Sequence, residues 1–200
     1  MNRILKDSLA LFLITFISGL ALGVVYNVTK EPIKNAEVRA EQEAYKRVLP
    51  EAVEFVEDEQ LDVEEANRLI GEKLANTEMK KVLAGKDSSG NTVGYVMNVS
   101  NMAGYGGEIN ITVGILNDGT LKGYETLINN ETAGLGQKAK EPAFSDQFKD
   151  KKVDFFEVVK SGKQQDYEID SISGATITSK AVTNAVNGAL IYFYAIGGGE

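Results

Sequence analysis

Residues 109–128 read INITVGILNDGTLKGYETLI, and this stretch predicts the fold of the chain. Two runs that look like strands, 109–116 and 121–128, are separated by Asn117-Asp118-Gly119. An Asp-Gly pair between two such runs is one of the strongest short-range signals for a β-hairpin. The stretch therefore predicts two adjacent antiparallel strands at the centre of the protein.

The same kind of pattern extends outward in both directions from this hairpin. Before it, Val82–Gly85 and Thr92–Val99 flank a turn at 86–91, which predicts a second hairpin. The other expected elements are helices at about 38–49, 63–74, 141–149 and 176–195, and a strand at 167–172. In the last helix, Val182, Val186, Leu190 and Phe193 form one apolar stripe. We therefore expect an α+β domain with a mainly antiparallel sheet and packed helices.

The amino-terminal part of the chain is strongly apolar. The stretch Leu9–Tyr26 holds no charge, and as a helix it would be roughly 27 Å long, close to the ~30 Å hydrocarbon core of a bilayer. It predicts a membrane anchor; a signal peptide cleaved near Ala21-Leu22-Gly23 is the alternative. The short N-terminus and the acidic remainder favour a domain outside the cytoplasm. The expected organisation is an anchor (1–30), a helical stalk with outer helices (31–80) and an α+β domain (81–200).

Composition restricts the chemistry that this protein can perform. The chain has no cysteine and no histidine, which excludes iron–sulfur clusters, histidine-ligated haem, ordinary zinc sites and catalytic triads with a histidine base. The formal net charge of −8 argues against nucleic-acid binding. Redox or catalytic work must therefore use an organic cofactor, oxygen ligands or a partner, and no metal site is predicted.

The segment Asp170–Ser179, DSISGATITS, lies where an expected strand runs into the last helix. Small residues let a ligand approach the backbone closely, and a helix N-terminus offers unpaired N–H groups to an anion. From the residues alone this is a candidate phosphate site. A serine that caps an ordinary helix is the simpler explanation, and the residues leave both open.

This segment resembles the flavinylation motif of FMN-binding domains in bacterial membrane redox complexes. The match consists of Asp170, Ser173, Gly174, Ala175 and Thr176. The resemblance implies that the hydroxyl oxygen of Thr176 forms a phosphoester with FMN, in a bond that a dedicated flavin transferase makes.

A second glycine segment, Glu131–Gly136 (ETAGLG), resembles a loop that these domains write as ETPGLG and that lies near the flavin. Ala133 replaces the usual proline, which removes no polar group. A third segment, Gly104–Gly107, resembles the family's Gly-Tyr segment and would bring Tyr105 to the ring. The resemblance thus implies cofactor-binding residues in all three segments: Tyr105, Glu131, Thr132, Gly134, Leu135, Gly136, Asp170, Ser173, Gly174, Ala175, Thr176, Thr178 and Ser179.

The resemblance covers nearly the whole chain, and its length is similar to that of the G subunits of Rnf complexes, the ion-translocating ferredoxin:NAD oxidoreductases. It implies an electron-transferring component with covalent FMN, which works with other membrane and peripheral subunits and is not an enzyme by itself. The C subunits of sodium-translocating NADH:quinone reductases share the motif but are typically longer. A membrane-anchored binding module without cofactor and a free-standing FMN reductase are alternatives from other classes.

Overall fold

The computed structural model describes residues 3–58 and 61–199 of the chain. Residues 1, 2, 59, 60 and 200, which fall in the predicted segments 1–30, 31–80 and 81–200, lie outside the described part. The chain forms two compact units, Met1–Ala40 and Glu41–Glu200, and each is described by itself.

The first unit consists of most of helix α1 (Arg3–Val48), whose last residues belong to the second unit. α1 is long and apolar enough to cross a membrane: its most apolar window has a mean hydropathy of 2.4, and none of that window is buried in the protein. Pro32 lies inside α1. The sequence pattern predicts a separate helix after this proline, whereas the structure has one continuous helix. An interior proline removes a backbone hydrogen bond and often kinks a helix, but here it does not end it.

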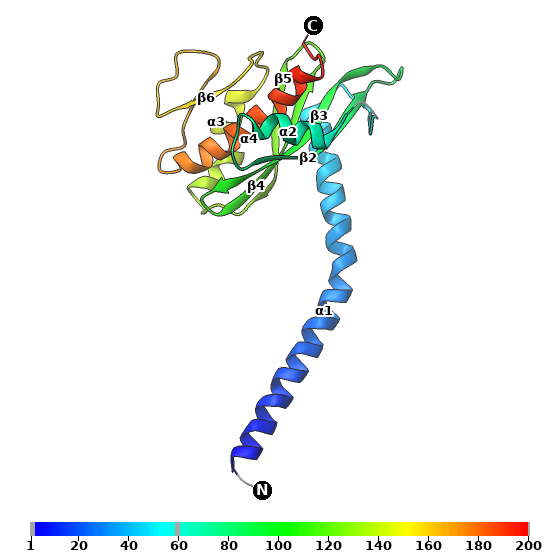
Figure 1. Ribbon diagram of the computed structural model, residues 1–200, viewed down its shortest axis with the longest axis vertical. Helices are drawn as coiled ribbons and strands as arrows, with labels where there is room; N and C mark the ends of the chain where they lie inside the picture. The colour runs from blue at the N-terminus through cyan, green and yellow to red at the C-terminus, as the bar shows by residue number, and fades with distance from the viewer. Residues whose placement is uncertain (1–2, 59–60, 200) are drawn as a thin grey trace. The chain divides into compact units, whose positions relative to one another are not determined.

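The second unit is built on an antiparallel sheet of five strands in sequence order (Figure 1). The strands are β1 (Glu54–Val56), β2 (Thr77–Lys86), β3 (Thr92–Gly104), β4 (Gly107–Leu116) and β5 (Leu121–Asn129). Both predicted hairpins are present, β2–β3 and β4–β5, and Ile115 faces Leu121 across the turn where Gly119 has φ +87°. The α+β class with an antiparallel sheet is confirmed.

Helices and two short strands complete the second unit. They are α2 (Val63–Gly71), the 3₁₀ turns η1 (Gly136–Lys140) and η2 (Asp146–Phe148), α3 (Pro142–Ser145), β6 (Glu157–Val159), β7 (Glu168–Asp170) and α4 (Thr176–Ala195). The bounds of α4 agree with the prediction. The expected helix at 141–149 is instead one α-helical turn followed by a 3₁₀ turn, and the helix expected at 63–74 ends at Gly71. The strand expected at 167–172 is shorter and pairs in parallel with β6, outside the main sheet.

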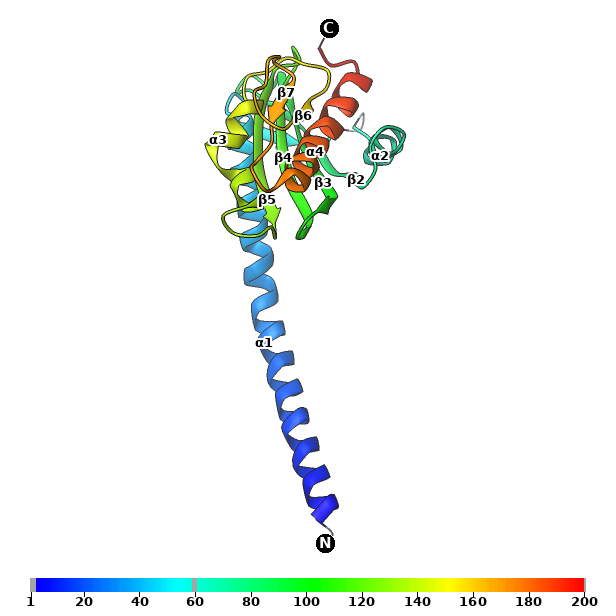
Figure 2. The same ribbon diagram turned by 90° about the vertical axis from the view of Figure 1, so that its left-hand side faces the viewer.

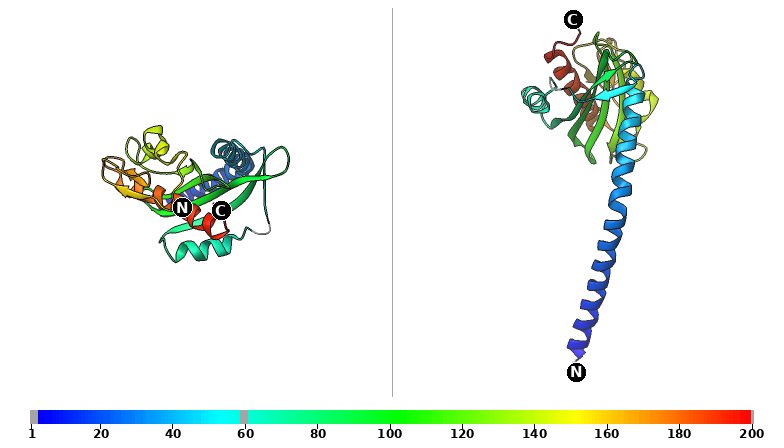
Figure 3. Two further views of the ribbon diagram at one scale, coloured as in Figure 1. Left: turned by 90° about the horizontal axis from the view of Figure 1, so that it is seen from above. Right: turned by 90° about the vertical axis from the view of Figure 1, so that its right-hand side faces the viewer.

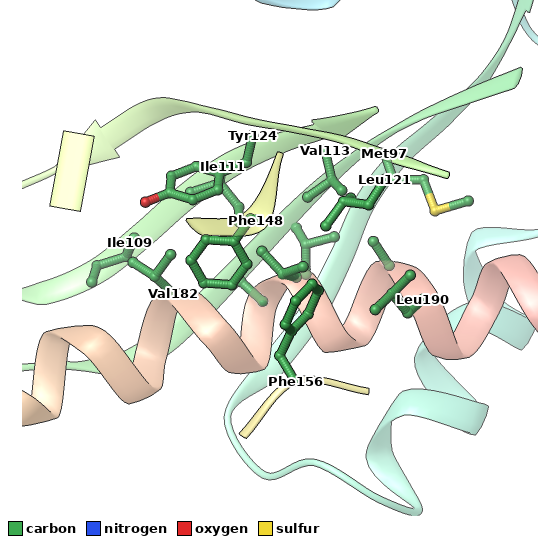
Figure 4. Close-up of a cluster of buried hydrophobic side chains, with 14 of the residues drawn as sticks. Met97, Ile109, Ile111, Val113, Leu121, Tyr124, Phe148, Phe156, Val182 and Leu190 are labelled. Carbon is green, nitrogen blue, oxygen red and sulfur yellow. The ribbon is translucent and has the colours of Figure 1, made fainter. Parts of the chain in front are cut away.

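One face of the sheet packs against α4, with α2 on the same side (Figure 2). The predicted stripe of Val182, Val186, Leu190 and Phe193 is buried there. Figure 4 shows the core between them, where Phe148 lies close to Phe156, with ring centroids 5.0 Å apart. The two phenylalanines that the sequence places four apart, Phe144 and Phe148, are both buried in this core and so tie the α3–η2 segment to it.

The opposite face of the sheet is covered by the last turns of α1, residues 41–48 (Figure 3). Tyr45 and Val48 pack there with Leu83 of β2. The approach is close enough that a Cβ on Gly114 would lie 2.1 Å from the carbonyl oxygen of Val48, so only glycine fits at this position. The stalk helix is therefore part of the folded domain from Glu41 onward.

Candidate functional site

A cleft of about 590 Å³ lies at one end of the second unit. Three segments far apart in the sequence form it: the turn between β3 and β4, the loop after β5 and the first turn of α4. Its lining residues are Tyr105, Glu131, Thr132, Leu135, Gly136, Gly174, Ala175, Thr176, Ile177 and Thr178. The structure thus brings the three glycine segments of the sequence together. The volume of the cleft lies in the range of small-molecule sites.

The amino-terminal end of α4 opens into this cleft. Ser179 N–H donates to the carbonyl of Ala175 at 3.0 Å, so the N–H groups of residues 176–178 precede the first helical hydrogen bond and have no partner within the helix. Thr176, the first helical residue, is exposed. Its hydroxyl therefore stands at a helix N-terminus, where backbone N–H groups and the helix dipole favour an anionic group such as a phosphate.

The turn before α4 has its own support. The Ser179 hydroxyl donates to the Ala175 carbonyl and accepts the N–H of Ile172, both at 2.9 Å. Gly174 has φ +76°, a conformation that disfavours other residues, and a Cβ there would lie 3.3 Å from the Leu135 side chain. Ser179 thus holds the start of α4 from inside, while Gly174 brings it against the loop that follows β5.

A buried carboxylate, Glu131, connects the walls of the cleft. The residue is 5% exposed. Its Oε2 accepts the hydroxyl of Thr178 on α4 at 2.9 Å, and its Oε1 accepts the N–H of Gly106 in the β3–β4 turn at 3.1 Å. One side chain therefore joins all three segments.

Glycines let the backbone approach this carboxylate. A Cβ on Gly136 would lie 2.5 Å from Glu131 Oε2, and one on Gly104 would lie 2.7 Å from Glu131 Oε1. A Cβ on Gly106 would lie 2.3 Å from the carbonyl oxygen of Asn130. These distances are shorter than real Cβ contacts, so close packing against Glu131 and the neighbouring backbone requires glycine at these positions.

Not every predicted residue lines the cleft. Ser173 and Gly134 are exposed beside it, and Ser179 is buried behind it. Asp170 lies at the end of β7, where its Oδ1 accepts the N–H of Lys163 at 3.0 Å. Their roles toward a cofactor stay predictions.

One lining residue was missed by the sequence reasoning. Ile177 is 53% exposed beside Thr176 at the cleft. The sequence did contain a signal for it: Ile177 lies outside the apolar stripe of α4, and an exposed isoleucine in the first turn of a helix indicates contact with a ligand or partner.

The residues of the cleft fit FMN. A helix N-terminus and the Thr176 hydroxyl suit its phosphate, and Tyr105, Leu135 and Ile177 offer aromatic and aliphatic surface for a planar ring. The fold and the cleft define an FMN-binding domain, and the family model described as "FMN-binding domain" matches residues 104–191. That range contains all three segments of the cleft.

Proteins similar over nearly the whole chain identify the family. The G subunit of the Na⁺-translocating ferredoxin:NAD⁺ oxidoreductase complex of Acetobacterium woodii is 38% identical over 92% of this chain and 88% of its own length. The G subunit of the proton-translocating complex of Clostridium ljungdahlii is 32% identical, covering 98% of both chains. The chain therefore belongs to the family of G subunits of ion-translocating oxidoreductase (Rnf) complexes, and it is one component of a multisubunit oxidoreductase.

A solved structure supports the fold. The crystal structure of Shewanella oneidensis NqrC is similar with a TM-score of 0.50 and 25% identity, over 57% of this chain and 58% of that one. The fold of this chain is thus shared with NqrC, while the two relatives that match over 88% and 98% of their own length are G subunits.

Proposed function

We propose that this protein carries FMN joined by a phosphoester to the hydroxyl oxygen of Thr176 and passes electrons within its complex. The observation that carries the proposal is the position of Thr176: an exposed hydroxyl on the first residue of α4, at the mouth of the cleft. When bound, FMN supplies the reversible acceptance of electrons, which no side chain of this chain offers. A covalent bond keeps the cofactor in a cleft that is open to solvent.

The chain's own residues would bind and orient the cofactor. The N–H groups of residues 176–178, which have no partner within the helix, would hold the phosphate, and the Gly174 turn would let it approach the backbone. Tyr105 and Leu135, 74% and 42% exposed, are free to cover the ring and exclude water from it. The exposed hydroxyl of Thr132 is available to polar atoms of the cofactor.

The partners follow from the family. The relatives from Acetobacterium woodii and Clostridium ljungdahlii belong to complexes that act on ferredoxin and NAD⁺, and we infer the same for the complex of this chain. Ion movement belongs to other components of the complex, because the apolar stretch Leu9–Tyr26 holds no charged residue. A flavin transferase is the further partner that attachment to Thr176 requires.

We place α1 as an uncleaved anchor in the cell membrane, with the cleft-bearing domain on the extracytoplasmic side. The helix from Arg3 to Val48, which is long and apolar enough to cross a membrane, supports an anchor. The absence of cysteine allows a direct test: Lys160→Cys introduces one thiol at an exposed position. A membrane-impermeant maleimide should label this variant, but not the wild type, in intact cells. Labelling only after lysis would refute the orientation.

The covalent bond is tested by flavin fluorescence in a denaturing gel. The full-length chain is expressed in membranes that contain the flavin transferase, beside Thr176→Val and the matched control Thr132→Val. Both threonines are exposed and line the same cleft, so the two substitutions remove equivalent hydroxyls. We expect fluorescent wild-type and Thr132→Val bands and a dark Thr176→Val band. A dark wild-type band beside another fluorescent flavoprotein would refute covalent attachment and favour an anchored binding module.

A further inference from the structure

The cleft contains a buried carboxylate, Glu131, that has no ion-pair partner in the part of the chain that the structure describes. Glu131 is 5% exposed, and its two carboxylate oxygens accept one backbone N–H and one hydroxyl. Within residues 3–58 and 61–199, no lysine or arginine forms an ion pair with it. Burying a carboxylate is unfavourable unless it is paired and hydrogen-bonded, so neutral donors alone compensate it only in part.

Stability does not require a charge at this position. A glutamine of the same shape could accept the Gly106 N–H through its oxygen and donate to the Thr178 hydroxyl through its nitrogen, because a hydroxyl both donates and accepts. The three segments would stay connected without a buried charge. The carboxylate therefore calls for an explanation beyond holding the cleft together.

We propose that Glu131 is a positioning residue that provides the fixed negative charge of the flavin site and holds the reduction potential of the flavin low. The inference rests on the proposed function. Glu131 lines the cleft, its carboxylate is held by hydrogen bonds to Gly106 and Thr178, and it lies against the backbone at Gly136. Adding an electron beside a fixed carboxylate is opposed by Coulomb repulsion, which is strong where water is excluded.

The Thr178 hydroxyl supplies the matched control. Thr178→Val removes the hydrogen bond to Glu131 Oε2 but leaves the carboxylate in place. Glu131→Gln removes the charge but keeps a partner for Thr178 and for Gly106. If the charge is the cause, Glu131→Gln raises the potential and Thr178→Val does not. If the hydrogen-bonded network is the cause, Thr178→Val changes the potential and Glu131→Gln, which keeps the network, leaves it unchanged.

The experiment measures the midpoint potential of the bound flavin by reductive titration of the full-length flavinylated protein in detergent. We expect Glu131→Gln to shift the midpoint potential upward and Thr178→Val to shift it downward, since a carboxylate that has lost a hydrogen bond is less screened. An unchanged potential in Glu131→Gln, or equal shifts in both variants, would overturn the inference.

A second measurement needs no flavin. In a Thr176→Val background, which has no attachment hydroxyl, we expect Glu131→Gln to unfold at the same temperature as its parent or at a higher one. A clearly lower temperature would show that the carboxylate is a structural group and would also overturn the inference. A dark wild-type band in the gel refutes covalent attachment and with it this inference. A fluorescent band with an unmoved potential refutes only the role of Glu131.

Discussion

Replacing Gly136 by alanine tests whether the cleft depends on close packing around Glu131. The added Cβ would lie 2.5 Å from Glu131 Oε2, 2.6 Å from Glu131 Cβ and 2.7 Å from Thr178 Oγ1. Carbon atoms pack at about 3.5–4.0 Å, so the shortfall is about 1 Å. Glu131 Cβ cannot rotate away because it is bonded directly to the backbone. Thr178 Oγ1 donates a hydrogen bond to Glu131 Oε2, so neither oxygen can move without breaking that bond. The loop must therefore move or the Glu131–Thr178 bond must break.

The magnitude follows from two opposing effects. Overpacking of this kind costs about 1–3 kcal/mol. Alanine also reduces the freedom of the unfolded chain, which returns about 0.4–1 kcal/mol. A net loss of about 1–2 kcal/mol lowers the midpoint of thermal unfolding by roughly 2–8 °C for a domain of this size.

The assay is thermal unfolding of the full-length protein followed by near-UV circular dichroism. The chain has no tryptophan, so the buried tyrosines Tyr45, Tyr124 and Tyr192 report on tertiary packing. Gly71→Ala is the control, because a Cβ there meets nothing within 4 Å and the residue ends a helix. Equal midpoints for the two variants would refute the packing argument.

Two further predictions concern groups away from the cleft. The Asn98 side chain donates a hydrogen bond to Glu41 and accepts one from the Thr112 hydroxyl at 2.8 Å. Asn98→Ala leaves buried polar groups without a partner and should lower the free energy of unfolding by about 1–3 kcal/mol in urea titrations. An unchanged free energy would refute a stabilising role for these bonds. Burial raises the pKa of Tyr124 above its ordinary value near 10, so the folded state keeps the proton that the unfolded state releases. The contribution of Tyr124 to the free energy of unfolding should be fully present below about pH 10 and decline as the pH rises further. Tyr124→Phe should flatten that decline in unfolding curves measured at several pH values. An equally steep decline in the variant would exclude Tyr124 as a contributor.

Local chemistry made part of the fold predictable. The Asp118-Gly119 turn and the flanking strands appear where the pattern placed them, because a hairpin depends on neighbouring residues and on a turn that tolerates positive φ. Helix α4 also begins and ends at the expected residues. By contrast, the pattern predicted a separate stalk helix after Pro32, since nothing local indicates that one helix continues from the apolar span through this proline.

The motif at Thr176 likewise allowed the family to be predicted from the sequence. The site as an arrangement did not follow from it. No local rule pairs Glu131 with Thr178, 47 positions away, and the parallel pairing of β6 with β7 has no turn signal because the connection is long. The missed Ile177 belongs here too, since its place at the cleft depends on segments remote in sequence.

The sequence alone determined the apolar span, the hairpins, the last helix and the family to which the motif at Thr176 points, because each depends on neighbours along the chain. Only the tertiary structure decided that three glycine segments form one cleft, that residues 41–48 of the stalk helix cover the second face of the sheet, and that Glu131 is buried. These features depend on the packing of the sheet against α1 and α4. That packing selects among the contacts that local preferences leave open.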